Sequence, residues 1–71
     1  MKLKVRVNRY TKTVDAVVRN GIVSFLYKNK LDETSKLSVN IDGKWYKAKL
    51  QQKIDELDLV YLNIRDSLTK L

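Results

Sequence analysis

The stretch VDAVVRNGIVSFLY, residues 14–27, decides the fold class because it places a tight-turn signal between two apolar runs. Asn20 and Gly21 suit the two central positions of a type I′ turn, where both residues need a positive φ. Pairing outward from this turn sets Val18 opposite Val23, Ala16 opposite Phe25 and Val14 opposite Tyr27. These pairs form an apolar face and the residues between them a mixed one. The stretch therefore predicts an antiparallel strand pair that buries one side.

The same pattern recurs on both sides of this hairpin. Asp42-Gly43 predicts a second tight turn, which joins the strand of Leu37, Val39 and Ile41 to that of Tyr46, Ala48 and Leu50. Residues 2–7 alternate strictly, with Leu3, Val5 and Val7 on one side and Lys2, Lys4 and Arg6 on the other. We therefore expect an all-β fold, a small antiparallel barrel or sandwich of five to six short strands.

An offset of 34 residues reveals a similarity between the two halves of the chain. It sets residues 2–37 over residues 36–71 and matches Leu3 with Leu37, Val5 with Val39, Phe25 with Leu59 and Tyr27 with Tyr61. Shared strand patterning would also produce such matches, so duplication and coincidence both stay open. A duplication would give two β-β-β halves related by a pseudo-two-fold axis.

Residues 50–71 allow two interpretations. An amphipathic helix fits the alternating four- and three-residue spacing of Leu50, Ile54, Leu57, Tyr61, Ile64, Leu68 and Leu71. Poor helix formers such as Asp55, Asp58 and Asn63 oppose it, and residues 57–64 (LDLVYLNI) are rich in strand formers. We expect a strand at 57–64 followed by a short helical turn. The alternative is a β-rich α+β fold with one C-terminal helix over residues 50–71.

The composition excludes several kinds of site. The chain has 71 residues, which indicates a single small domain over residues 1–71, and it contains neither cysteine nor histidine. Disulfides, zinc sites and histidine bases are thus excluded, and the acidic cluster Asp55, Glu56 and Asp58 lacks the spacing of a calcium loop. We expect no enzyme activity, no metal and no cofactor. No stretch has the apolar length of a signal peptide or a membrane span, which predicts a cytoplasmic protein without membrane contact.

The net charge of +7 is confined to the first part of the chain. Residues 1–30 hold eight basic residues against Asp15 alone, whereas charges cancel over residues 31–71. Such an excess suits a polyanionic partner. Alternation sets Lys2, Lys4 and Arg6 about 7 Å apart, close to the phosphate spacing of a single strand. Lysines that merely keep an exposed sheet soluble would give the same pattern.

Trp45 is the aromatic side chain that we expect on an outer face, because Tyr46, Ala48 and Leu50 take the inner one. It would lie among lysines of the same strand, namely Lys44, Lys47, Lys49 and Lys53. A tryptophan in this setting could stack a base, anchor a protein interface or lie under a neighbouring loop. The candidate nucleic-acid-binding residues are Lys2, Lys4, Arg6, Arg9, Lys12, Arg19, Trp45, Lys47 and Lys49.

Two functions remain after these exclusions. The first is a non-catalytic nucleic-acid-associated binding module that contacts DNA or RNA phosphates through a basic N-terminal strand. The second is a small protein-interaction or inhibitor module that binds an acidic protein surface and could form a homo-oligomer. The small core and the expected exposure of Trp45 and Leu26 favour this second interpretation.

Overall fold

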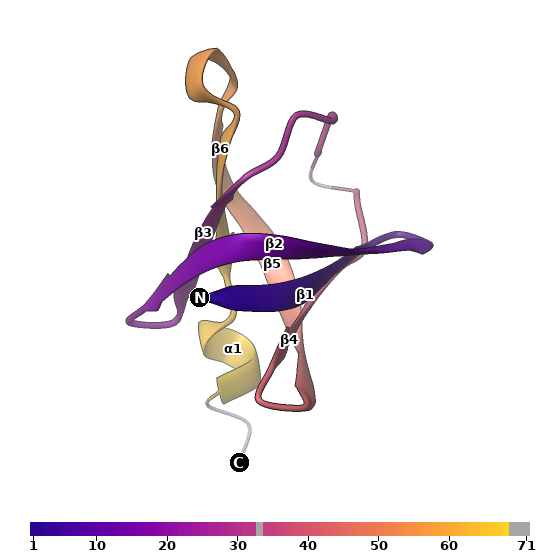
Figure 1. Cartoon of the computed structure of the whole chain (residues 1–71), viewed down its shortest axis with the longest axis vertical. Helices are drawn as coiled ribbons and strands as arrows, with labels where there is room; N and C mark the ends of the chain where they lie inside the picture. Colours follow the sequence, from indigo (N-terminus) through magenta and orange to yellow (C-terminus); the bar gives the residue numbers. More distant parts are fainter. Residues whose placement is uncertain (33, 69–71) are drawn as a thin grey trace.

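Six antiparallel strands form a closed barrel in the computed structural model (Figure 1). The structure describes residues 1–32 and 34–68, with the backbone alone for residues 66 and 68. The strands are β1 (Lys2–Val7), β2 (Tyr10–Arg19), β3 (Ile22–Leu26), β4 (Leu37–Ile41), β5 (Lys44–Ile54) and β6 (Leu59–Asn63). A 3-10 turn, η1 (Asp55–Leu57), joins β5 to β6, and the helical turn α1 (Arg65–Leu68) follows β6. The all-β barrel expected from the sequence is confirmed.

Both predicted hairpin turns have the expected geometry. The φ angles are 52° and 76° at Asn20 and Gly21, and 54° and 87° at Asp42 and Gly43. The ladders contain the predicted pairs Val18–Val23 and Ala16–Phe25. In the second hairpin, which was predicted without its residue pairs, Leu37 pairs with Ala48 and Val39 with Tyr46. The predicted Val14–Tyr27 pair lies outside the ladder because β3 ends at Leu26. The Tyr27 amide instead donates to the carbonyl oxygen of Asp58 at 2.7 Å.

The C-terminal third forms a strand, as predicted, but the strand covers Leu59–Asn63 instead of residues 57–64, because Asp55–Leu57 form η1. Val60, Leu62 and Ile64 are buried while the residues between them are half-buried, a period of two that a helix cannot produce. The alternative with one helix over residues 50–71 is wrong, since β5 continues to Ile54 and only four residues form α1. The predicted terminal helical turn is confirmed. No helix in the described ranges is long and apolar enough to cross a membrane.

The barrel has the topology of two related halves. The order β1-β2-β3-β6-β5-β4 joins the meanders β1–β3 and β4–β6 through antiparallel seams β1:β4 and β3:β6. In the first seam Val5 pairs with Val39, its counterpart at the offset of 34. The second seam pairs Val23 with Leu62 and Phe25 with Val60. A two-fold axis exchanges these two pairs only if the halves are offset by 37 residues, so that Val23 corresponds to Val60 and Phe25 to Leu62.

The match of Phe25 with Leu59 is therefore displaced by three residues. The irregular register at Leu50/Gln52 and the three-residue η1 both precede β6 and lengthen the second half. The end of the second predicted copy, residues 69–71, lies outside the described part of the chain. A common origin of the halves stays a prediction.

The inner face of the barrel is one apolar cluster. It contains Leu3, Val5, Val7, Val14, Ala16, Val23, Phe25, Tyr27, Leu37, Val39, Val60, Leu62 and Ile64. Among the described side chains none that is charged is buried, and no buried polar atom lacks a hydrogen-bond partner. All charged chemistry is thus carried on the outside.

Candidate nucleic-acid interface

The outward side chains of β1 and of the first half of β5 gather on one side of the barrel. The ladders align Lys4 with Asn40 and Asn40 with Trp45, and in the next row Arg6 with Ser38 and Ser38 with Lys47. We call this surface the basic face; it consists of Lys2, Lys4, Arg6, Trp45 and Lys47.

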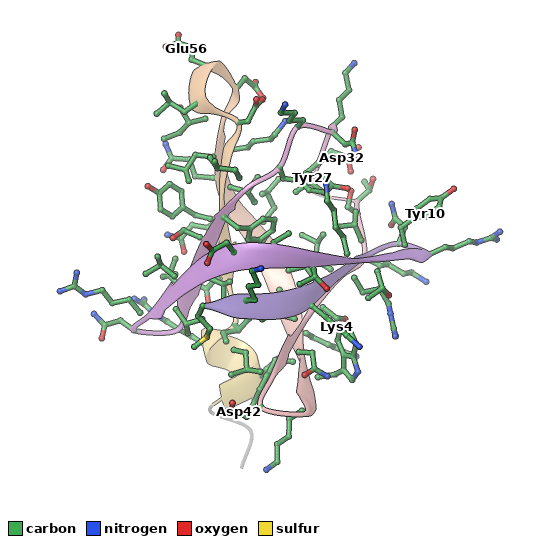
Figure 2. All side chains as sticks on the ribbon, viewed as in Figure 1. Lys4, Tyr10, Tyr27, Asp32, Asp42 and Glu56 are labelled. Carbon is green, nitrogen blue, oxygen red and sulfur yellow. The ribbon has the colours of Figure 1, made fainter. Side chains whose placement is uncertain are left out.

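Closure of the barrel creates this face. Burial of Leu3, Val5 and Val7 turns the even-numbered residues of β1 outward. The β1:β4 seam then brings β1 to β5 across a single intervening strand, a separation of about 10 Å. Side chains about 40 residues apart in the sequence thus become neighbours. Figure 2 shows Lys4 on β1, at the side of the β4–β5 hairpin that carries Asp42 at its turn.

The arginine and the tryptophan of the basic face contact each other. The guanidinium carbon Cζ of Arg6 lies 4.4 Å from the ring centroid of Trp45. Arg6 Nε also donates a long hydrogen bond of 3.4 Å to Thr11 Oγ1 on β2. Trp45 is 41% exposed, as expected from the sequence, and Arg6, rather than a loop, covers part of its ring.

Neutral polar groups surround the cations of this face. Thr11 and Thr13 on β2 pair with Arg6 and Lys4, and Ser38 lies between Arg6 and Lys47. These hydroxyls can donate hydrogen bonds to phosphate oxygens. The sequence did not reveal them as site residues, because only the register of β1 with β2 and β4 places them there.

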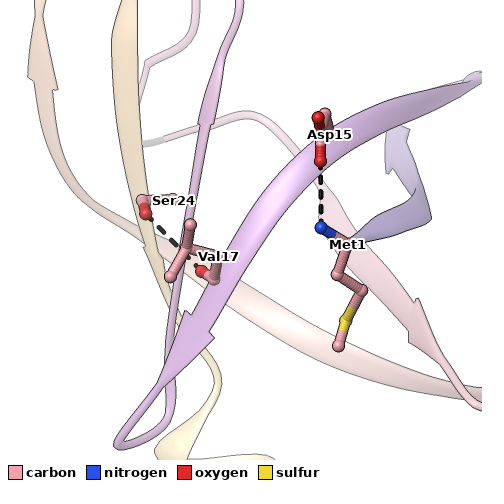
Figure 3. Close-up of polar contacts among 4 residues, drawn as sticks. All are labelled: Met1, Asp15, Val17 and Ser24. Atoms are coloured by element: carbon pink, nitrogen blue, oxygen red, sulfur yellow. Dashed lines mark hydrogen bonds and ion pairs between the residues drawn. The ribbon is translucent and has the colours of Figure 1, made fainter.

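Asp15 marks the acidic border of the face. It pairs with Lys2 across the β1:β2 ladder, and the Met1 amine donates to its Oδ1 at 2.9 Å (Figure 3). The hydrogen bond and the positive charge of this amine lower the pKa of the Asp15 carboxyl. The ion pair neutralises Asp15 locally, so the carboxylate opposes the charge of the face only weakly.

The remaining candidates are spread over the molecule. Arg9 lies in the turn between β1 and β2, and Lys49 lies farther along β5, opposite Asn63. The prediction that Lys12 and Arg19 extend the same stripe is wrong. Lys12 pairs with the inward-facing Val5, and its Nζ lies 5.9 Å from the Tyr27 ring centroid.

Arg19 lies outside the stripe of basic residues on β1 for a different reason. It points outward, but it pairs with Ile22 next to the β2–β3 turn, beyond the end of the β1 ladder. It therefore lies on the β2–β3 side of the barrel. Residue alternation along a strand predicts the side of the sheet correctly but not the position around a closed barrel.

An irregular register in β5 turns Lys53 away from the outer face, where it was expected beside Trp45. Leu50 pairs with the inward Leu62 and Gln52 with Tyr61, so one residue is inserted and the alternation inverts. Lys53 consequently pairs with buried Val60, its side chain is 13% exposed, and its Nζ lies 3.2 Å from Asp55 Oδ1. Lys44 lies next to the turn, opposite Ile41.

A shallow hollow adjoins the basic face. It encloses about 430 Å³ between the start of β1 and the β4–β5 turn, and Lys2, Lys4, Asn40 and Asp42 contribute to its lining. Asn40 Oδ1 accepts a hydrogen bond of 3.1 Å from the Gly43 amide, which fixes this wall. The described side chains include no group of carboxylates placed to hold a metal ion.

Comparison of the chain with models of known protein families, with curated proteins and with solved structures gave no match.

Proposed function

We propose that the chain is a non-catalytic module that binds single-stranded nucleic acid through its basic face. Lys2, Lys4, Arg6 and Lys47 contact phosphates, and Trp45 stacks a base. The observation that carries the proposal is the contact between Arg6 and Trp45. These residues lie in two adjacent rows across the sheet that contain no carboxylate, namely Thr13, Lys4, Asn40 and Trp45, and Thr11, Arg6, Ser38 and Lys47. A cation and an exposed aromatic ring side by side match the two parts of a nucleotide, its phosphate and its base.

The contact between Arg6 and Trp45 does not prevent stacking. An exposed cation–π contact contributes about 0.5–1 kcal/mol, whereas stacking of a base on an aromatic side chain contributes about 1–3 kcal/mol. A base can therefore displace Arg6 from the ring. The released guanidinium stays within reach of the adjacent phosphate, where its paired donors form bidentate hydrogen bonds.

The geometry favours a single strand over a duplex. Lys2, Lys4 and Arg6 follow β1 at intervals of about 7 Å, which suits successive phosphates of an extended strand. The bases of a duplex are stacked on one another and cannot reach Trp45, whereas an unpaired base can.

The test is a salt titration with fluorescently labelled oligonucleotides, single-stranded and duplex, followed by anisotropy. Four neutralised phosphates give a slope of log K against log salt of about −3 for a single strand, at roughly 0.7 per phosphate. The double variant Lys4→Ala/Arg6→Ala should reduce the slope by about 1.4. No binding at low salt would refute the proposal.

The matched control is Lys12→Ala/Arg19→Ala, which removes the same charge away from the basic face. It should leave the slope within about 0.3 of the unmodified chain. Equal losses in both double variants would mean that net charge alone drives binding. A failure with every oligonucleotide, combined with salt-dependent binding to an acidic protein, would favour the protein-interaction function instead.

A further inference from the structure

A hollow lies beside the β1–β2 hairpin, whose turn projects from the body of the barrel (Figure 1). It encloses about 340 Å³, and its apolar wall comes from Val5 and Val7 of β1 and Val14 of β2. Lys12 and Tyr27 also line it. We call this hollow the β1–β2 pocket. It is separate from the basic face, because Val5 and Val7 point to the inner side of β1.

A lysine occupies the position on β2 where the barrel core ends. Val14 and Ala16 are buried, whereas the preceding inward position is the exposed Lys12, which pairs with Val5. Directly paired residues lie on the same side of a sheet, so the Lys12 side chain borders the apolar wall. Its ammonium is the only charge among the described residues that line the pocket, and it forms no ion pair within residues 1–32 and 34–68.

Tyr27 supplies a hydrogen-bond donor whose position is fixed. Its side chain packs edge-on against Phe25, with ring centroids 6.2 Å apart, and its amide donates to the Asp58 carbonyl oxygen at 2.7 Å. Lys12 Nζ lies 5.9 Å from its ring centroid. Tyr27 is only 9% exposed, yet its hydroxyl has no hydrogen-bond partner in the described part of the chain. Because a buried tyrosine hydroxyl normally has such a partner, this one is free to bind a ligand.

We propose that the β1–β2 pocket binds a small apolar carboxylate. The carboxylate accepts a hydrogen bond from the Tyr27 hydroxyl and pairs with the Lys12 ammonium, while the apolar body lies against Val5, Val7 and Val14. One cation and one neutral donor match a head group with a single negative charge. The volume is close to the lower end of the range for small-molecule sites, which restricts the ligand to a small one.

Titration of the isotope-labelled full chain with benzoate, followed by the amide chemical shifts, tests the proposal. We expect saturable shifts at Val5, Lys12 and Tyr27, with a dissociation constant on the order of 1 mM. Benzyl alcohol has a similar shape without the charge and should bind at least about tenfold more weakly. Inorganic phosphate has the charge without the apolar body and should give no saturable shift at these amides.

Two variants remove the polar groups of the pocket one at a time. Tyr27→Phe keeps the ring against Phe25 but lacks the hydroxyl, and should weaken benzoate binding about tenfold. Lys12→Gln should weaken it about threefold, because the ammonium is exposed. The matched controls are Tyr61→Phe on β6 and Lys47→Gln on the basic face, which remove the same groups elsewhere and should change the affinity less than about twofold. The amide spectrum of each variant establishes that it is folded.

Several results would overturn the proposal. These are the absence of saturation up to about 20 mM benzoate, equal affinity for benzyl alcohol, and equal losses in the two variants and their controls. Binding of a nucleoside monophosphate in the pocket in place of benzoate would also overturn it. The outcome is independent of the proposed nucleic-acid function, since Lys12→Gln should weaken benzoate binding and leave the salt slope for oligonucleotides unchanged.

Discussion

The turn between β2 and β3 provides a sharp test of how the C-terminal segment supports the barrel. Gly21 has a φ of 76°, and a Cβ atom at this position would overlap Cγ of Arg65. Arg65 Nε donates to the Asn20 carbonyl oxygen at 2.9 Å, and the Ile64 amide donates to that of Gly21 at 2.9 Å. The turn is thus fastened to the residues that follow β6.

Gly43 offers the matched comparison. Its φ is 87°, so it needs the same left-handed backbone, but a Cβ there would meet no atom within 4 Å. Gly43→Ala therefore measures the backbone cost alone, about 1–2 kcal/mol. Gly21→Ala adds displacement of Arg65 and loss of its hydrogen bond, about 1–2 kcal/mol more. At roughly 4–8 °C per kcal/mol, its melting temperature should lie about 5–15 °C below that of Gly43→Ala.

Thermal and urea unfolding, followed by circular dichroism, supply the measurement. Arg65→Ala should remove most of this difference. The double variant Gly21→Ala/Arg65→Ala should be little less stable than Arg65→Ala/Gly43→Ala, because the overlap with Arg65 is gone and each double variant bears the same backbone cost. Equal melting temperatures for the two single glycine variants would show that Arg65 does not pack on the turn. A persistent gap between the two double variants would show that the extra cost at Gly21 has another source.

Three further predictions concern the core, an acid-sensitive loop and the basic face. Leu62→Ala should lower the free energy of unfolding by about 2–5 kcal/mol, because Leu62 is fully buried. This loss approaches the whole stability of so small a domain, so circular dichroism at 25 °C should show a largely unfolded chain. Hydrogen bonds from Thr34 and Ser35 lower the pKa of the Asp32 carboxyl. The contribution of Asp32 to the free energy of unfolding is therefore present above the unfolded pKa of about 3.9, and it is lost as pH falls through the lower folded pKa. Urea unfolding between pH 6 and pH 2 should show that Asp32→Asn loses less stability on acidification than the unmodified chain does. Trp45→Ala should weaken single-strand binding by roughly 5- to 150-fold, and Trp45 fluorescence should be quenched on binding, a signal that is specific because the chain has one tryptophan.

Local patterns predicted most of the strand positions. Asn20-Gly21 and Asp42-Gly43 determine their turns because few other residue pairs accept two successive positive φ angles, and the register next to each turn follows directly. A strand within residues 57–64 was predictable because Val60, Leu62 and Ile64 bury alternate positions, and β6 occupies Leu59–Asn63. In the same segment, the helical spacing of apolar residues was misleading, since Leu57 is 61% exposed in η1 and contributes nothing to the core.

What the sequence could not predict depends on contacts between distant strands. The inverted alternation after Leu50 turns Lys53 inward, and no turn residue announces it. Lys12 and Arg19 were assigned to one stripe because alternation says nothing of where a strand passes around a closed barrel. The Arg6–Trp45 contact requires the β1:β4 seam, and the hydroxyls of Thr11 and Ser38 become part of the basic face only through the same closure.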